Sequence, residues 1–362
     1  MRPLLPLASP LLVVALASSC GGEPPPQPVP VPPGTPTPSA SVAVVAPPAQ
    51  PVTVRRVLVS LTRPSGSSVM TTAPDGTITD VFDMSWNGRG PHADATMRLA
   101  PDGTLASFEA HGHHMMQAPV DETFALQGGR AQWKSHEENG EQAVTGSAFF
   151  VPIADVPDTL GMLAQALLKA GGTMALLPAG EAHIEKTGEA TVQAGGQQRH
   201  LTAYAITGLD LTPQRVWMQD DGSWFGVVSP WFSLVPEGWE SVIDPLVEKQ
   251  QAFDRARDLQ NAQRLAHQPP AAGLALTHAR VLDVERGRWL ADQTVVVVGD
   301  VIKAVGPSKT TKVPAGAETV DLAGKALIPG LWDMHAHLGD ADGALNIASG
   351  VTTVRDVGND PD

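Results

Sequence analysis

The sequence of 362 residues predicts a mainly β protein that ends in the first strand, helix and strand of a parallel α/β fold. Three observations predict this class. Short alternating apolar runs fill residues 54–236, hairpin patterns occupy residues 271–330, and a strand–helix–strand pattern follows them. The expected order is an N-terminal antiparallel β domain, a small β-sandwich and one β/α unit.

Residues 1–19 are typical of a secretory signal peptide. Arg2 supplies the positive charge, Leu4–Ala17 the apolar segment, and Ala17-Ser18-Ser19 a cleavage site of small residues. Cys20, the single cysteine, follows directly, which resembles the lipobox of bacterial lipoproteins. The resemblance implies lipidation of Cys20, export to the bacterial cell envelope and a membrane anchor. Ala17 stands where that motif usually has leucine, so periplasmic or secreted protein with a free thiol is the alternative.

Residues 20–53 contain the lipidation site and a proline-rich linker. Proline removes backbone donors and fixes φ, so the segment Glu23–Pro51 cannot form a helix or a sheet. We expect a disordered, extended spacer of polyproline II type. A recognition tract for a proline-binding partner is the alternative.

Residues 54–236 predict antiparallel hairpins, because their apolar runs are separated by turn residues. The expected strands are Val57–Leu61, Thr77–Phe82, Ala95–Leu99, Leu105–Ala110, Thr123–Leu126 and Ala143–Phe150. The expected turns include Pro74-Asp75-Gly76, Pro101-Asp102-Gly103, Gly128-Gly129, Asn139-Gly140 and Asp220-Asp221-Gly222. One helix is expected at Asp158–Ala170, where leucines recur at helical spacing before two glycines.

Residues 237–270 predict a second helix and a linker. Pro245 suits the first turn of a helix that begins near Asp244, and Pro269-Pro270 ends the segment. The apolar residues at helical spacing, expected on one face, are Leu246, Phe253, Ala256 and Leu265.

Two groups of side chains in the β domain invite functional hypotheses. Imidazoles and thioethers, which together suit Cu(I), are concentrated at His111, His113, His114, Met115 and Met116. We favour a polar strand end with methionines packed beneath it. Aromatic residues that could bind sugar or peptide are Trp217, Trp224, Phe225, Trp231, Phe232 and Trp239. Their spacing does not keep them on one strand face, so we expect them in the core of a hairpin meander.

Residues 271–330 predict a small β-sandwich. The runs Val295–Val298 and Val301–Val305 flank the two-residue turn Gly299-Asp300, a strong hairpin signal. The runs Glu318–Leu322 and Lys325–Ile328 flank Ala323-Gly324 in the same way.

Residues 331–362 carry the chemistry. Leu331–Leu338 is a short apolar strand with Asp333, His335 and His337 at alternate positions, which point to one side of a strand. The two imidazoles can therefore converge on one metal ion. Asp333 could hydrogen-bond an imidazole or shape the site from behind the ligands. A helix at 341–349 and a strand at 350–356 follow.

Residues 274–356 resemble the N-terminal part of the amidohydrolase superfamily. The matching pieces are Val295–Gly306, the run from Ala323 through Pro329-Gly330 to His337, and Gly350–Asp356. The resemblance implies a small β-sandwich joined to a metal-binding (β/α)8 barrel that hydrolyses C–N bonds of a small-molecule, peptide-like or cyclic amide substrate. It also implies His335 and His337 as ligands of a divalent ion, most often Zn. Arg355 could contact a substrate carboxylate, with a structural ion pair as the alternative.

The remaining length sets a further expectation. A (β/α)8 barrel takes about 250 residues, and only 31 (362 − 331) follow Leu331. We therefore expect an N-terminal fragment with an incomplete barrel that is weak or inactive alone, and the catalytic residues of later strands stay unassigned. A non-catalytic, lipid-anchored surface β protein that binds a ligand or partner is the alternative function. The formal net charge of −14 argues against nucleic acid.

Overall fold

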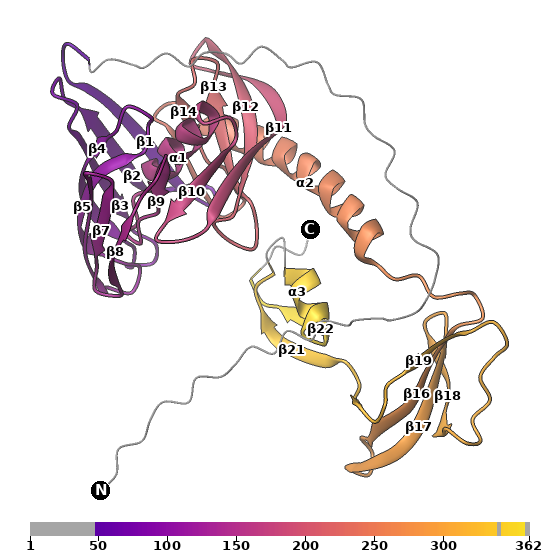
Figure 1. The fold of residues 1–362 in the computed structure, drawn as a ribbon. Coiled ribbons are helices and arrows are strands. Elements are labelled where there is room, and N and C mark those ends of the chain that lie inside the picture. Colours follow the sequence, from indigo (N-terminus) through magenta and orange to yellow (C-terminus); the bar gives the residue numbers. More distant parts are fainter. Residues whose placement is uncertain (1–47, 339–341, 359–362) are drawn as a thin grey trace, which may run out of the picture. The chain divides into compact units, whose positions relative to one another are not determined.

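The computed structural model of the chain describes residues 48–338 and 342–358 (Figure 1). The predicted signal peptide, Cys20 and most of the linker at 20–53 lie outside the described residues. Within these ranges the protein is mainly β, with two large sheets, one five-stranded sheet and a two-stranded sheet. None of the helices in the described ranges is long and apolar enough to span a membrane.

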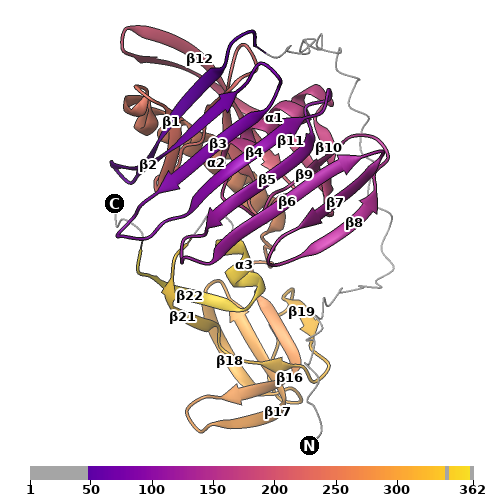
Figure 2. The same cartoon turned by 90° about the vertical axis from the view of Figure 1, so that its left-hand side faces the viewer.

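The first sheet has nine strands (Figure 2). In spatial order they are β15 (Phe232–Pro236), β1 (Val52–Ser60), β2 (Arg63–Thr72), β3 (Ile78–Met84), β4 (His92–Leu99), β5 (Leu105–His113), β6 (Pro119–Gln127), β7 (Arg130–Lys134) and β8 (Asn139–Ala143). Strands β1 to β8 follow one another through hairpins, and β15, from much later in the chain, pairs with β1. Burial alternates along β3 and β4, so one face of this sheet lines the core and the other faces solvent. The antiparallel hairpins predicted from turn spacing are confirmed.

The second sheet has six strands. Their order is β14 (Trp224–Gly226), β13 (Gln214–Gln219), β12 (Gln197–Thr207), β11 (Glu181–Ala194), β10 (Thr173–Leu177) and β9 (Ala148–Phe150). The pair β9–β10 is parallel because α1 (Asp158–Lys169) connects these strands as a crossover helix. The helix predicted at Asp158–Ala170 is confirmed to within one residue.

Two apolar cores lie on this scaffold. The larger combines the inner face of the nine-stranded sheet with α1 and part of the six-stranded sheet, and its largest buried side chains include Phe108, Phe149, Phe150 and Leu167. The smaller is built around Trp217, Phe225 and Trp239 with the start of α2. The aromatic residues are therefore mostly core, as expected, except that Trp231 and Phe232 are exposed.

A buried polar cluster joins the first sheet to α1. Arg56 of β1 forms an ion pair with Asp158, the first residue of α1, and both side chains are almost fully buried. The Ser68 hydroxyl lies within hydrogen-bond distance of Asp158 and, at 3.0 Å, of Oδ1 of Asp80, and its single proton can be donated to either carboxyl group. The guanidinium of Arg56 also lies 4.3 Å from the ring centroid of Trp224 and donates to its carbonyl oxygen.

Asp80 is the carboxyl group of this cluster that retains a proton to higher pH than an ordinary aspartate. Burial, the charge of Asp158 and a hydrogen bond with Asp158 raise the pKa of Asp80 to about 7. Burial also raises the pKa of Asp158, but Arg56 opposes that shift. No donor among the described residues reaches Oδ2 of Asp80. We therefore assign the charge to Asp158, beside Arg56, and the proton to Asp80.

Gly161 in α1 is a test of this packing. A Cβ built on Gly161 would lie 2.5 Å from Cγ and Cδ2 of Trp224, the ring against which Arg56 stacks. Alanine gains about 1 kcal/mol of helix propensity over glycine, yet overpacking costs about 1–3 kcal/mol. Urea unfolding should therefore show Gly161→Ala to be less stable than wild type. The control Gly343→Ala, in a helix with open space around it, should not be destabilised; a stabilised Gly161→Ala variant would contradict the packing.

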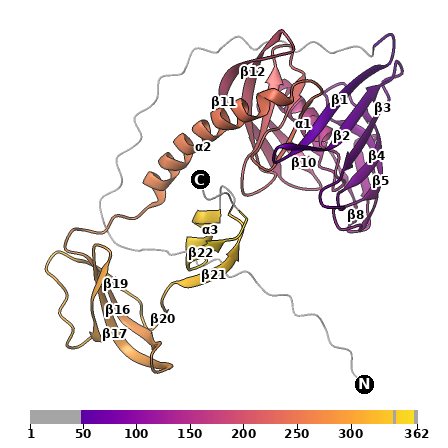
Figure 3. The ribbon, with the colours of Figure 1, turned by 180° about the vertical axis from the view of Figure 1, so that it is seen from behind.

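The second helix, α2 (Ile243–Leu265), follows a 3₁₀ turn, η1 (Glu240–Val242), and starts beside β11 (Figure 3). Ile243 and Leu246 are buried, and Phe253 packs against Gly188 of β11. The prediction of one continuous apolar face is wrong beyond this point, because Ala256 and Leu265 are exposed. The helix also ends at Leu265, before the two prolines.

Two turn predictions are wrong. Asn139-Gly140 opens strand β8, and the β7–β8 turn lies at 135–138, where the Ser135 hydroxyl accepts the N–H groups of Glu137 and Glu138. Glu318–Leu322 and Lys325–Ile328 do not pair with each other. They contribute β19 (Glu318–Asp321) and β20 (Ala326–Leu327), which both run parallel to β16 (Leu274–Asp283).

Residues 274–327 form one sheet in which β18 (Val301–Pro307), β17 (Arg288–Val298), β16 and β19 are neighbours. The predicted β17–β18 hairpin around Gly299-Asp300 is confirmed. Strands β19 and β20 extend this sheet along the edge of β16, and the small β-sandwich expected at residues 271–330 stays a prediction.

Candidate metal centre

The strand–helix–strand unit predicted at the end of the chain is present. Strand β21 (Leu331–Ala336) and strand β22 (Val351–Asp356) are parallel, and α3 (Asp342–Ala348) connects them. Gly330 allows the two strands to approach each other closely, because a side chain at that position would overlap Thr352. An incomplete (β/α)8 barrel is not shown: the described residues contain this one unit, and β21 and β22 form a sheet of two strands.

His335 and His337 lie side by side at the end of β21. Their ring centroids are 5.4 Å apart and their planes are inclined by 75°. Two imidazoles on one tetrahedral zinc, with Zn–N bonds of about 2.0–2.1 Å, have centroids roughly 5 Å apart. The spacing therefore fits two ligand positions of such an ion, and both side chains are exposed to an incoming ligand.

Of the two roles considered for Asp333, the structure shows the aspartate supporting the shape of the motif. Its Oδ1 accepts the backbone N–H of His335 at 3.0 Å, so it holds the main chain of the motif instead of an imidazole ring. The pairing of β21 with β22 is irregular between Asp333 and Ala336, which is where the histidine motif starts. The carboxylate replaces strand pairing for that N–H group.

Asp356 and Gly358 also determine the local structure around the histidine pair, a role that was not predicted from the sequence. Oδ2 of Asp356 accepts the N–H of Leu338, and its Oδ1 accepts the N–H of Gly358, both at 2.9 Å. A Cβ at Gly358 would overlap Nδ1 of His337, so glycine leaves room for that ring. The sequence signal that could have identified these two residues is an aspartate two positions before a glycine at the end of the second predicted strand.

Arg355 is exposed on β22, and no carboxylate among the described residues lies within ion-pair distance of it. The structural ion pair considered for it is therefore not observed in this part of the chain. Its guanidinium is accessible to solvent next to the strand end that carries Asp356.

The donor set of the histidine pair is incomplete within the described residues. No group of three or more histidine, cysteine, aspartate or glutamate side chains there is arranged to hold a metal ion. Catalytic zinc sites need three protein ligands and a water, and structural sites need four. The pair thus fits part of a metal site, and no reaction step can be derived from it alone.

The histidines proposed as a copper alternative do not converge. His111 pairs with Glu109 and Asp121, and His114 pairs with Asp155 at 2.9 Å. His113 has its ring 6.0 Å from that of His92 instead. These side chains make separate polar and ring contacts at the end of β5, as a polar strand end predicts. The expectation of methionines packed beneath it is wrong, because Met115 and Met116 are 37% and 67% exposed.

Comparison with known proteins gives partial matches. No family model matches the chain. A stretch of 69 residues is 44% identical to a dihydroorotase from Trichlorobacter lovleyi and covers 18% of this chain and 15% of that enzyme. A prolidase-type protein of Bifidobacterium longum shares 35% identity over 25% of this chain and 24% of that chain, with a TM-score of 0.21.

A β-barrel-like protein of a domain of unknown function from Brucella abortus matches 51% of this chain and 95% of its own, at 14% identity and a TM-score of 0.32. This chain spans less than a quarter of each of the two hydrolases that it matches. The similarity to a dihydroorotase supports a relationship to amidohydrolase-type hydrolases over a small region.

Proposed function

We propose that this chain carries the first metal-binding strand of an amidohydrolase-type hydrolase that cleaves C–N bonds in amide-like, peptide-like or cyclic amide substrates. The observation that carries the proposal is the side-by-side position of His335 and His337 at the end of a parallel strand. The 44% identity with a dihydroorotase over 69 residues supports it.

The chain's own residues contribute two imidazole ligands, and the metal is a divalent ion, zinc by preference for such ligands. When bound, such an ion lowers the pKa of its water and polarises a carbonyl group. Asp333 would hold the backbone of the motif, and the exposed Arg355 would attract a substrate carboxylate. The remaining ligands and the proton shuttle have no counterparts among the described residues, and we propose that the chain alone has weak or no activity.

The envelope location is part of the same proposal. The signal-like residues 1–19 and the small residues before Cys20 support export and lipidation, and the proline-rich linker would separate the folded part from the membrane. Radiolabelled palmitate incorporation that is lost in Cys20→Ser would support the anchor; equal labelling would exclude it.

Zinc titration of the full chain tests the metal site. We expect one zinc per chain, with affinity reduced at least about tenfold in His335→Ala and in His337→Ala, since losing even an outer-shell partner of a ligand can cost that much. Competition with a chromophoric chelator measures both the stoichiometry and the affinity.

The matched control is His183→Ala. His183 is also exposed on a strand and pairs with Glu181 at 3.1 Å, but it has no second histidine beside it. This variant should bind zinc as wild type does. Equal affinities in wild type, His335→Ala and His337→Ala would show that the pair is not the metal site.

A further inference from the structure

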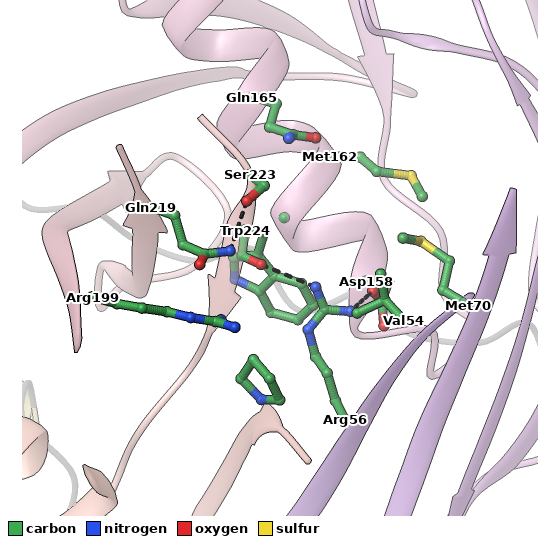
Figure 4. A pocket seen from close by; sticks show the side chains of 12 residues that line it. Val54, Arg56, Met70, Asp158, Met162, Gln165, Arg199, Gln219, Ser223 and Trp224 are labelled. Carbon is green, nitrogen blue, oxygen red and sulfur yellow. Dashed lines mark hydrogen bonds and ion pairs between the residues drawn. The ribbon is translucent and has the colours of Figure 1, made fainter. Parts of the chain in front are cut away.

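A cavity of about 280 Å³ opens beside the start of α1, in the part of the chain formed by the two large sheets (Figure 4). Its apolar wall consists of Val54, Met70, Met162, Trp224 and Pro236. Its polar wall includes Arg199 of β12, Gln165 of α1, and Gln219 and Ser223 near the β13–β14 turn. No residue of the histidine pair lines it, so the cavity is independent of the candidate metal centre.

Arg199 is held rigidly at this cavity. Its guanidinium carbon lies 4.3 Å from the ring centroid of Trp239 and 5.9 Å from that of Phe225. These two rings are buried and meet edge to face, so they form a fixed platform. Stacking on an aromatic face leaves the in-plane N–H donors of arginine available. Figure 4 shows the guanidinium directed toward Trp224 and the cavity.

The charge of the cavity is set by Arg199. The other cation in its wall, Arg56, is neutralised by Asp158. Within the described ranges, no carboxylate lies within ion-pair distance of Arg199. Asp221 is near enough for Arg199 to contribute to lowering its pKa, but the main cause is its hydrogen bond from the Ser223 hydroxyl. The cavity therefore carries one positive charge that no neighbouring carboxylate contacts.

The neutral polar groups of the wall already make hydrogen bonds within the protein. Nε2 of Gln165 donates to the carbonyl of Gly222 at 2.9 Å, and Nε2 of Gln219 donates to the Ser223 hydroxyl at 2.7 Å, which leaves one N–H on each amide. Arg199 is the charged donor of the wall that can receive an anionic ligand. Beside it, the thioethers and the indole ring present a polarisable apolar surface that suits a planar or branched group.

We propose that this cavity binds a small organic monoanion, a carboxylate attached to an aromatic or branched aliphatic group, with Arg199 as its charge partner. Arginine matches the geometry of a carboxylate with two parallel hydrogen bonds. The cavity volume of about 280 Å³ lies just below the range of about 300–1,000 Å³ for pockets that bind drug-sized ligands. The expected ligand is therefore smaller than a typical drug. The carboxylate could belong to a free acid or to the C-terminus of a peptide-like molecule.

Isothermal titration of the full chain with four probes tests the proposal. Phenylacetate represents a free acid, N-acetylphenylalanine a peptide-like carboxylate, phenylacetamide the neutral isostere and phenethylamine a cation. At least one of the two acids should bind with one site per chain and at least tenfold more tightly than phenylacetamide and phenethylamine. Which acid binds more tightly identifies the source of the carboxylate.

Variants locate the charge partner. Arg199→Gln should weaken binding of the preferred acid at least tenfold, whereas Arg130→Gln, which removes an exposed arginine paired with Glu141, should leave it unchanged. Because Arg199 packs on Trp239 and its loss could disturb folding, Asp221→Asn provides a second test. Removing this nearby negative charge should strengthen binding of the acid.

Three results would overturn the proposal: no binding of either acid, equal binding of acid and amide by wild type, or a folded Arg199→Gln variant that binds the acid as wild type does. None of them bears on zinc binding by the histidine pair, so this proposal and the proposed function can fail separately.

Discussion

Asp158→Asn is expected to lower the free energy of unfolding by about 3 kcal/mol, because removing one partner of a buried ion pair leaves the other charge unpaired. The remaining charge is that of Arg56, whose side chain is 4% exposed. Burial lowers the pKa of Arg56, but a guanidinium remains protonated throughout the accessible pH range. Urea unfolding followed through tryptophan fluorescence measures the effect.

The neighbouring Asp80 limits this loss. With Asp158 neutral, Asp80 can ionise and become the counterion of Arg56, since the Ser68 hydroxyl bridges both carboxyl groups. The double variant Asp80→Asn/Asp158→Asn should therefore lose more stability than the sum of the single variants, by about 1 kcal/mol or more. Glu141→Gln, which breaks an exposed pair with Arg130, should cost no more than about 1 kcal/mol. An Asp158→Asn loss as small as that of Glu141→Gln would contradict the buried pair.

Asp80→Asn is expected to stabilise the protein at pH 8 and to remove a pH dependence of stability. In the folded chain the pKa of Asp80 is raised to about 7, whereas an unfolded aspartate titrates near 3.9. The stability that protonated Asp80 contributes to the folded state is thus fully present below pH 4, and it is lost as the pH rises through about 7. At 1.36 kcal/mol for each pKa unit, the loss is at most about 4 kcal/mol.

Unfolding free energies at pH 5 and pH 8 measure this dependence. The asparagine side chain of the variant cannot ionise, so its advantage over wild type should grow between these two pH values. Asp83→Asn is the matched control, because Asp83 is on the same strand, β3, but its side chain is 70% exposed. Parallel pH profiles of wild type and Asp80→Asn would show that Asp80 is ionised in the folded protein.

Local patterns in the sequence predicted most of the elements. Helix α1 follows from leucines at helical spacing before Gly171, and the β17–β18 hairpin follows from a two-residue turn between β-branched runs. The same pattern around Ala323-Gly324 misled, because β19 and β20 each pair with β16, about forty residues earlier. Turn residues show where a chain reverses, but they do not specify which distant strand accepts its hydrogen bonds.

The proximity of His335 and His337 could be predicted because they are two residues apart at the end of one short strand. That they bind a metal ion stays a prediction. The cavity and the buried cluster could not be predicted from local patterns. Arg56 and Asp158 are 102 positions apart in the sequence, and Arg199 lines the same cavity only because the two sheets and α1 pack together. The burial of α2 was overestimated for a similar reason. Its spacing of apolar residues says nothing about where the neighbouring strands end, and only its first turns meet β11.

Segment exchange with the dihydroorotase tests the central claim most directly. In the Trichlorobacter lovleyi enzyme, the segment that matches this chain over 69 residues would be replaced by this chain's residues, extended where needed to include His335 and His337. We expect the hybrid to keep metal-dependent dihydroorotase activity, and to lose it when His335 or His337 is replaced by alanine. A soluble, folded hybrid that is inactive, or one whose activity does not change with those two substitutions, would contradict the assignment of this histidine pair.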